Sequence, residues 1–172
     1  MAESIKLYAG IGSRKTPKIL LDIMEGTARY LAKQGYLLRS GGAPGADNAF
    51  EVGAFGAYQS TPWKLMQRYT ATGDNIKRVT PTIYSHASRH SYKYDTRSSY
   101  VKKLMLRNVQ IILGERGDQP VDFVVCWTPN GKDTGGTGVG LRVAAEHNIP
   151  IFNLHDPAIL ERITNKTGQM IL

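Results

Sequence analysis

Apolar residues recur along the chain with two spacings, one typical of strands and one typical of helices. Short apolar runs predict strands within residues 5–12, 36–40, 121–127 and 149–154. Helical spacing predicts helices within 16–35, 46–59, 98–114 and 157–172, and another after the glycines of 135–140. Thr16 is the expected N-cap of the first helix, and Gly35 is its expected C-cap. Strands that alternate with helices predict an α/β domain with a mostly parallel sheet.

Glycine-rich turns follow three of the predicted strands, in LYAGIGSRKTP (7–17), LRSGGAPGADNAFEVGAFG (38–56) and DTGGTGVGLRVAAEHNIPIFNL (133–154). The free amide groups and aligned dipoles of a helix N-terminus favour a bound anion. Open α/β sheets bind ligands at the carboxyl ends of their strands, so we expect the three turns to form one phosphate-binding site. A glycine-rich turn with no ligand is the alternative for each of them taken alone.

Two carboxylates accompany the second turn. Asp47 comes one residue after the predicted helix start at Ala46, where the helix N-terminus favours an acid for structural reasons alone. A role in ligand binding or catalysis is the other interpretation. Glu51 follows four residues later on the same helix face, so both side chains could face the glycine turns.

Length and charge narrow the classes of protein. The 172 residues suit one domain, 1–172, and the single Cys126, in an apolar strand pattern, is expected to be buried. The chain has no apolar run long enough for a membrane span and no signal peptide pattern, so we expect a cytoplasmic protein without a membrane partner. The net charge of +8 favours phosphorylated or polyanionic partners.

Apolar residues show no clear periodicity in residues 58–97, which are expected to form an irregular insertion. Basic residues and tyrosines are interleaved there, which suits nucleobases and single strands, although a solvated basic face with half-buried tyrosines is the commoner outcome. His86 and His90 have the four-residue spacing that could bind a metal on a helix. Because no acidic residue lies between them and Cys126 is distant, we predict no metal site.

The segments YAGIGSR, SGGAPGADNAFE, LRN and CWTPNGKDTGGTG together resemble the SLOG superfamily, named for the SMF/DprA and Lonely Guy (LOG) proteins, and its DprA-like branch in particular. The resemblance runs over about residues 5–155. It implies a single Rossmann-like domain, a nucleotide-type ligand over the strand ends and frequent homo-oligomers. The ligand-binding positions expected from the turns and the resemblance are Gly10, Gly12, Ser13, Arg14, Ser40, Gly41, Gly42, Ala43, Gly45, Ala46, Asp47, Arg107, Asn108, Thr128, Gly135, Gly136, Thr137, Gly138 and Arg142.

The sequence departs from the LOG phosphoribohydrolases at their signature PGGxGTxxE. The glutamate that serves catalysis there falls on Arg142, and the threonine falls on Val139, whereas the arginine of the preceding helix has a counterpart in Arg107. A guanidinium cannot accept a proton as the glutamate does, but it can bind a phosphate with two hydrogen bonds. The resemblance therefore favours binding over turnover.

Three functions remain open. The first is a binding protein that captures a nucleotide or an ADP-ribose-like signalling molecule as a sensor or a sequestering protein, as related SLOG domains in bacterial and phage defence systems suggest. The second is a LOG-like nucleotide N-glycosidase, with Asp47, Glu51 and Arg107 as the candidate catalytic residues. The third is single-stranded DNA binding in the manner of DprA, favoured by the net charge and the basic, tyrosine-rich middle. None of the three calls for a cofactor.

Overall fold

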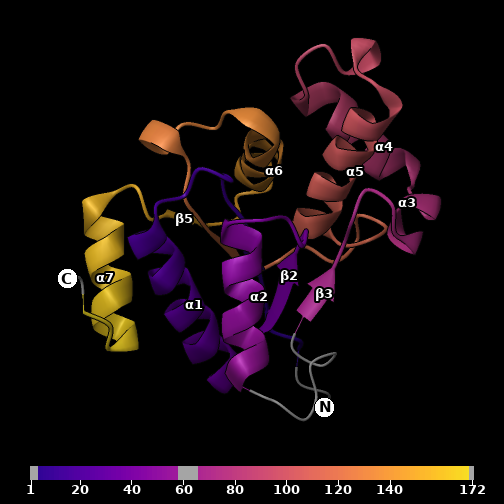
Figure 1. The fold of residues 1–172 in the computed structure, drawn as a ribbon. Helices are drawn as coiled ribbons and strands as arrows, with labels where there is room; N and C mark the ends of the chain where they lie inside the picture. Colours follow the sequence, from indigo (N-terminus) through magenta and orange to yellow (C-terminus); the bar gives the residue numbers. More distant parts are fainter. Residues whose placement is uncertain (1–3, 58–65, 171–172) are drawn as a thin grey trace.

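A five-stranded parallel sheet forms the centre of the computed structural model, which describes residues 4–57 and 66–170 (Figure 1). The strands lie in the order β3-β2-β1-β4-β5, and every neighbouring pair is parallel. Their bounds are β1 Leu7–Gly10, β2 Leu37–Ser40, β3 Met66–Arg68, β4 Phe123–Cys126 and β5 Ile151–Asn153. The parallel α/β architecture predicted from the sequence is confirmed.

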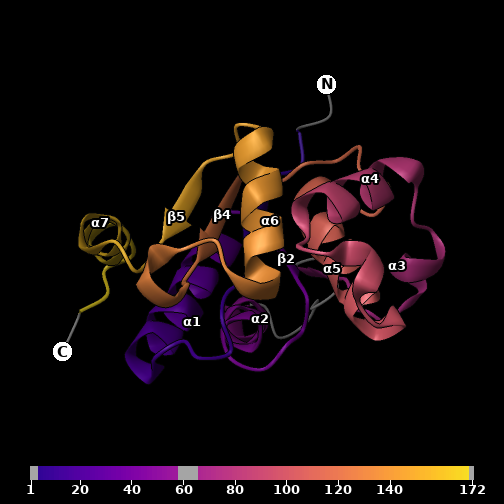
Figure 2. The same ribbon diagram turned by 90° about the horizontal axis from the view of Figure 1, so that it is seen from above.

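Helices cover both faces of the sheet, as Figures 1 and 2 show. One layer contains α1 (Lys18–Lys33) and α2 (Ala46–Ala57), with α7 (Pro157–Thr167) beside the edge strand β5. The other layer contains α5 (Ser99–Leu113) and α6 (Gly135–Glu146), with α4 (Pro81–His90) and the short α3 (Asp74–Lys77) packed outside them. Seen from above in Figure 2, α6 and α2 lie on opposite sides of the sheet.

The alternation of side chains along each strand builds two apolar cores. Tyr8 and Leu38 face α1 and α2, whereas Ala9, Val124 and Cys126 face α5 and α6. Most of these core positions were indicated by the hydrophobic spacing, but Ile83, Ala87 and Tyr94 of the middle segment were not, and Ile19 of the predicted α1 stripe is exposed. Cys126 is buried as expected, and burial raises the pKa of its thiol to about 12. Among the described residues, no helix is long and apolar enough to cross a membrane.

The start of α1 differs from the prediction. Its N-cap is Pro17, and Thr16 instead turns its hydroxyl back to donate a 2.6 Å hydrogen bond to the carbonyl oxygen of Ser13. The prediction that Thr16 caps this helix is therefore wrong, because the turn of the first glycine loop binds that hydroxyl. At the other end the C-cap is Gln34, one residue earlier than the predicted Gly35, which follows it with a φ of 85°.

The middle of the chain is more regular than its pattern indicated. Within the part of 58–97 that the structure describes, β3 adds an edge strand next to β2, and α4 packs against α5 and α6. The prediction of an irregular insertion is wrong for these elements. Strand β3 was not predicted because it is short and polar, and its pairing with β2 holds it in the sheet rather than an apolar pattern of its own. Tyr58 and Lys64, counted in the basic, tyrosine-rich pattern, lie outside the described residues.

Candidate functional site

The three glycine-rich turns meet at the carboxyl end of the sheet around one cavity of about 510 Å³. Strands β1, β2 and β4 end there, and the turns that follow them supply residues to the same cavity wall. The expected ligand-binding positions that line it are Gly12, Ser13, Arg14, Ala43, Asp47, Arg107, Asn108, Thr128, Gly135, Gly136 and Thr137. Residues far apart in the sequence thus form one site, in the place where parallel sheets bind ligands.

The N-terminus of α6 opens into this cavity. The glycines lie within the first turn of the helix rather than in a loop before it, because α6 begins at Gly135. The amide of Gly138 donates a 3.2 Å hydrogen bond to Thr134, so the amides of Gly135, Gly136 and Thr137 precede the first bonded turn. Gly135 has a φ of 68°, which favours glycine at this entry. These three residues present a helix N-terminus to an anion in the cavity.

Arg107 and Asn108 of α5 connect two of the turns. Nη1 of Arg107 donates a 2.7 Å hydrogen bond to the carbonyl oxygen of Gly41, and its Nε donates one of 2.7 Å to Oδ1 of Asn108. The amide group of Asn108 in turn donates a 2.9 Å hydrogen bond to the carbonyl oxygen of Gly136. Arg107 is buried, so a fixed positive charge lies at the cavity wall between the second and third turns.

Asp47 is the acidic residue in the cavity wall. Burial raises the pKa of its carboxyl to about 6, although the charge of Arg107 and hydrogen bonds from Ala43 and Gly41 oppose the shift. Its Oδ2 accepts a 3.2 Å hydrogen bond from the amide of Ala43 and so fixes the turn before α2. A carboxyl with a pKa near neutrality inside a cavity can serve structure, ligand binding or proton transfer.

Glu51 and Arg142 have partners outside the cavity wall. Glu51 is buried, and both of its oxygens accept hydrogen bonds from Arg68: Oε1 from Nε at 3.0 Å, and Oε2 from Nη2. Arg142 donates from Nε and Nη2 to the carbonyl oxygen of His90 and from Nη1 to that of Asp133. The guanidinium of Arg142 therefore ties the end of α4 to the segment before the third turn.

The other expected positions lie outside the cavity lining, and several of them are glycines in close contact with neighbouring groups. Gly10 lies against the ring of Phe50, and Gly138 lies against the carbonyl of Asp133. Gly45 has a φ of 90° at the entry to α2, where a side chain would be strained. The positions without a place in the cavity lining are Gly10, Ser40, Gly41, Gly42, Gly45, Ala46, Gly138 and Arg142.

Helix α5 forms a wall of the cavity that the glycine turns did not indicate. Tyr100, Leu104 and Met105 line it, and Lys15 joins Arg14 in the first turn. The helical spacing had assigned Leu104 and Met105 to the core, and spacing alone does not distinguish a core from a cavity. Tyr100 is 56 % exposed and lines the same cavity as the two basic residues.

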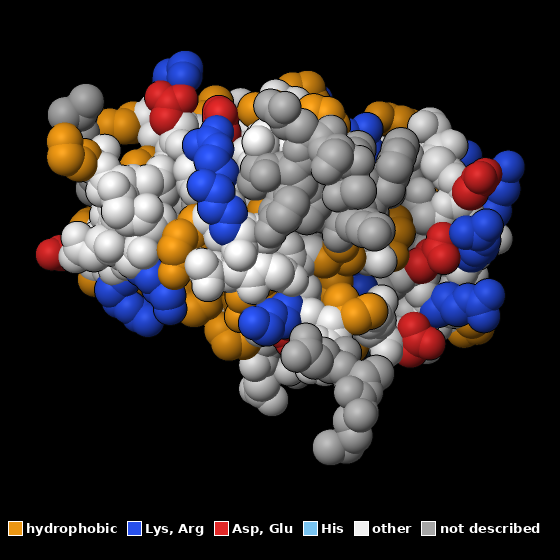
Figure 3. All heavy atoms as spheres, turned by 90° about the horizontal axis from the view of Figure 1, so that it is seen from below, with side chains coloured by type: hydrophobic (Ala, Val, Ile, Leu, Met, Phe, Trp, Pro, Cys, Tyr) orange, Lys and Arg blue, Asp and Glu red, His pale blue; other side chains and the backbone are white. Residues whose placement is uncertain are grey.

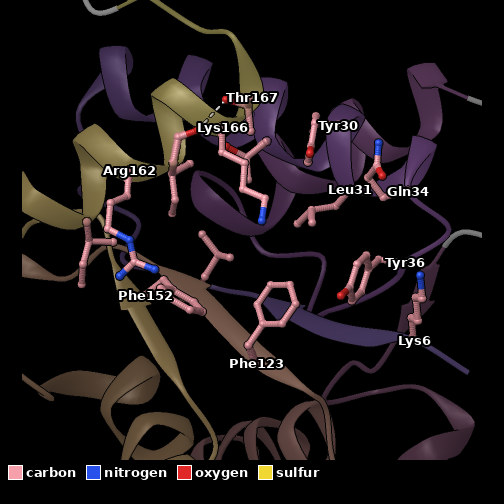
Figure 4. A pocket seen from close by; sticks show the side chains of 14 residues that line it. Lys6, Tyr30, Leu31, Gln34, Tyr36, Phe123, Phe152, Arg162, Lys166 and Thr167 are labelled. Atoms are coloured by element: carbon pink, nitrogen blue, oxygen red, sulfur yellow. Dashed lines mark hydrogen bonds between the residues drawn. The ribbon is translucent and has the colours of Figure 1, made fainter.

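A second cavity, of about 450 Å³, lies between α1, α7 and the sheet (Figure 4). Phe123 and Phe152 line its sheet side, and Lys166 points into it from α7. Figure 3 shows the molecule from below, where the coloured Lys and Arg side chains stand in separate groups. This second cavity has no glycine turn or helix N-terminus in its lining, so the strand-end cavity is the stronger candidate for a phosphorylated ligand.

One group of three potential metal ligands occurs among the described residues, outside both cavities: His86, Glu146 and His147. The histidine pair considered from the sequence, His86 and His90, lies on α4 with ring centroids 6.3 Å apart. The structure thus brings His86 to a different histidine, at the end of α6.

Comparison with known proteins identifies a structural relative and no sequence relative. No protein-family model and no curated protein matches the chain. DNA processing protein A (DprA) from Helicobacter pylori, solved to explain its single-stranded DNA binding mode, has a similar fold with a TM-score of 0.54. The two chains share 16 % sequence identity over 95 % of this chain and 79 % of the other. At this identity the similarity shows a DprA-like fold and leaves the ligand to be argued from the site.

Proposed function

We propose that the strand-end cavity binds the phosphate of a nucleotide unit, and that single-stranded DNA presents this unit. One observation carries the proposal: the first-turn amides of α6 open into a cavity whose wall contains the buried cation of Arg107. Backbone amides at a helix N-terminus and a guanidinium are both strong partners for a phosphate. Arg14 and Lys15 add positive charge at the same cavity.

The aromatic ring of Tyr100 supports a strand rather than phosphate alone. Proteins that bind single strands combine a basic groove with exposed aromatic rings on which bases stack. Tyr100 is exposed, and it lines the same cavity as Arg14 and Lys15. The similar fold of the Helicobacter pylori protein, which binds single-stranded DNA, and the net charge of +8 support the same ligand.

A free nucleotide or an ADP-ribose-like signalling molecule offers the same chemistry, so the experiment must separate the two sources. Fluorescence anisotropy of a labelled oligothymidylate measures strand binding, and unlabelled mononucleotides and ADP-ribose are added as competitors. We expect the oligonucleotide to bind and its affinity to fall steeply with salt, as phosphate contacts require. An oligonucleotide that is not retained at low salt, together with tight binding of a mononucleotide, would replace the strand with the free nucleotide.

A substitution at the third turn tests the site itself. Gly136→Asp places a carboxylate in the cavity, where the nearest atom to a new Cβ is Nδ2 of Asn108 at 3.2 Å. We expect a folded protein that no longer binds the ligand, because the added charge repels phosphate. Gly56→Asp on α2 adds the same charge where no atom lies within 4 Å of a new Cβ, and it should bind normally. Equal affinities of the two variants would remove the third turn from the site.

Asp47 favours a second candidate function, cleavage of the N-glycosidic bond of a nucleotide. Its pKa of about 6 lies near the working range of a general acid or base, and it faces the same cavity as Arg107. Glu51 is a poorer candidate for this role, because Arg68 holds its carboxylate. Incubation with a nucleotide panel followed by chromatography tests turnover. A released base that disappears with Asp47→Asn supports an enzyme, and intact nucleotides support binding alone.

A further inference from the structure

Three potential metal ligands meet where α4 passes the end of α6. His86 of α4 and His147, just after α6, have their Nε2 atoms 2.9 Å apart. A carboxylate oxygen of Glu146, the last residue of α6, lies with both of these atoms in a group no wider than 4.8 Å. Two imidazoles and a carboxylate at this separation match the ligand set of three-ligand zinc sites.

The orientation of His86 suits a metal ligand. Its ring is buried, and its Nδ1 lies 2.8 Å from the carbonyl oxygen of Thr82. A carbonyl can only accept a hydrogen bond, so Nδ1 carries the proton, and the lone pair on Nε2 of neutral His86 accepts the hydrogen bond from Nε2 of His147. Metal-binding histidines are commonly fixed by such a bond from the other ring nitrogen. A metal ion on this lone pair would replace the hydrogen bond between the Nε2 atoms of His86 and His147.

The carboxylate of Glu146 is held in place by neighbouring cations. Arg89 donates a 2.7 Å hydrogen bond to Oε1, and the ring of His90 lies against Oε2. These two hydrogen bonds fix the orientation of the Glu146 carboxylate. Hydrogen bonds to a ligating carboxylate are typical of the residues that surround a metal site.

We propose that His86, Glu146 and His147 bind one divalent transition-metal ion, with Zn²⁺ as the best match. Two imidazole nitrogens favour zinc and its neighbours over Mg²⁺ or Ca²⁺, which prefer sets of oxygen ligands. Water completes the coordination, because Glu146 and His147 are exposed. From the sequence, His86 and His90 on one helix predicted no metal site. The site proposed here differs because Glu146 and His147, its other two ligands, come from the end of α6.

Such an ion would fasten α4 to α6. Near the same place, Arg142 binds the carbonyl oxygens of His90 and Asp133, and Asp133 leads into the third glycine turn. The metal would therefore reinforce a contact that already supports one wall of the strand-end cavity. The proposal does not depend on the ligand of that cavity.

The experiment titrates the chelator-treated full chain with Zn²⁺ by calorimetry and with Co²⁺ by visible absorption. We expect one equivalent of metal, a cobalt spectrum typical of nitrogen and oxygen ligands, and a higher Tm with zinc. His147→Ala should weaken zinc binding by at least about tenfold, because it removes a direct ligand, and should abolish the zinc-dependent rise in Tm. His155→Ala removes the one histidine of the chain outside this cluster of His86, His90 and His147; it lies near Trp127, and its loss should change neither result.

His86→Ala removes a buried side chain and is therefore not used alone. Glu146→Gln keeps the shape of the side chain at an exposed position, and we expect weaker zinc binding with an unchanged fold. The proposal is overturned if the wild type binds no zinc, or if His147→Ala and Glu146→Gln bind it as tightly as the wild type. A loss with His155→Ala equal to that with His147→Ala would show adventitious binding and would also overturn it.

Discussion

Nη1 of Arg107 donates a 2.7 Å hydrogen bond to the carbonyl oxygen of Gly41, across 66 positions of the sequence. This bond joins the middle of α5 to the turn after β2 inside the protein. It holds the guanidinium at the wall of the strand-end cavity, where the charge of Asp47 also acts on it. The same contact therefore supports the fold and places a positive charge where we propose that a phosphate binds.

Arg107→Lys should weaken both stability and ligand binding. A lysine has one ammonium group and cannot repeat the separate bonds to Gly41 and Asn108. Leaving a buried acceptor without its partner costs about 1–3 kcal/mol, which urea denaturation measures. Anisotropy with the labelled oligonucleotide should show weaker binding. Lys103→Met, an exposed change on the same helix, serves as the control for the loss of one positive charge.

Gly41→Ala should disturb the same contact from the other side. A Cβ at this position would overlap the guanidinium of Arg107 and come within 2.9 Å of Oδ2 of Asp47. Arg107 must then move away from its carbonyl partner, so we expect reduced stability and reduced ligand affinity together. Gly56→Ala, made on the open surface of α2, should show neither loss. Wild-type affinity in Gly41→Ala would contradict the proposed place of Arg107 in the site.

Asp47→Asn should remove a pH dependence of stability. The pKa of Asp47 rises from about 3.8 to about 6 on folding, so between these values the folded protein holds a proton that the unfolded chain has released. Stability therefore falls as the pH rises from 4 to 6, by roughly 3 kcal/mol for a shift of about two units. Asparagine has no such ionisation, so the variant should gain stability over the wild type above pH 6 and lose that advantage below pH 4. Denaturation curves at pH 4, 5, 6 and 7 measure this difference.

Tyr8→Phe should make the protein more stable. The hydroxyl of Tyr8 is buried, and among the described residues it has no hydrogen-bond partner. Its ring packs against Phe123 and Phe50, and phenylalanine would keep both contacts. Removing an unpaired buried hydroxyl should raise the free energy of unfolding by about 1 kcal/mol. Tyr36→Phe, at a half-buried ring in the same cluster, is the comparison, and a loss of stability in Tyr8→Phe would indicate a water partner.

The sequence predicted the parts of the fold that depend on local pattern. Strands β1, β2, β4 and β5 and helices α1, α2, α5 and α7 fall within the predicted segments, whereas α6 begins earlier, at Gly135, within the glycines that were expected to precede it. Strand β3 was missed because its three residues, Met66–Arg68, carry no apolar alternation. Its backbone pairs with β2, and that is a tertiary interaction that no local pattern reports.

The sequence predicted that the glycine turns meet, and it predicted the cations around them only in part: Arg14 and Arg107 line the cavity as expected, Lys15 was not expected, and Arg142 is not in the lining. Glycine turns at strand ends indicate a shared cavity, because parallel strands all end at one edge. Hydrogen bonds between distant segments decide which cation faces the cavity. Arg107 is held at the cavity wall by the carbonyl oxygen of Gly41, whereas Arg142 binds the carbonyl oxygens of His90 and Asp133. In the same way, His86 and His147 are 61 positions apart, so their contact has no sequence signature.

Both outer strands of the sheet, β3 and β5, are three residues long. Each offers few unpaired backbone groups to a strand from another molecule, and short edges of this kind oppose edge-to-edge polymerisation. A stable assembly of this protein would therefore have to bury helical surface instead of extending the sheet. Hydrogen exchange would show protection on assembly in helices, with the amides of the outer strands unchanged.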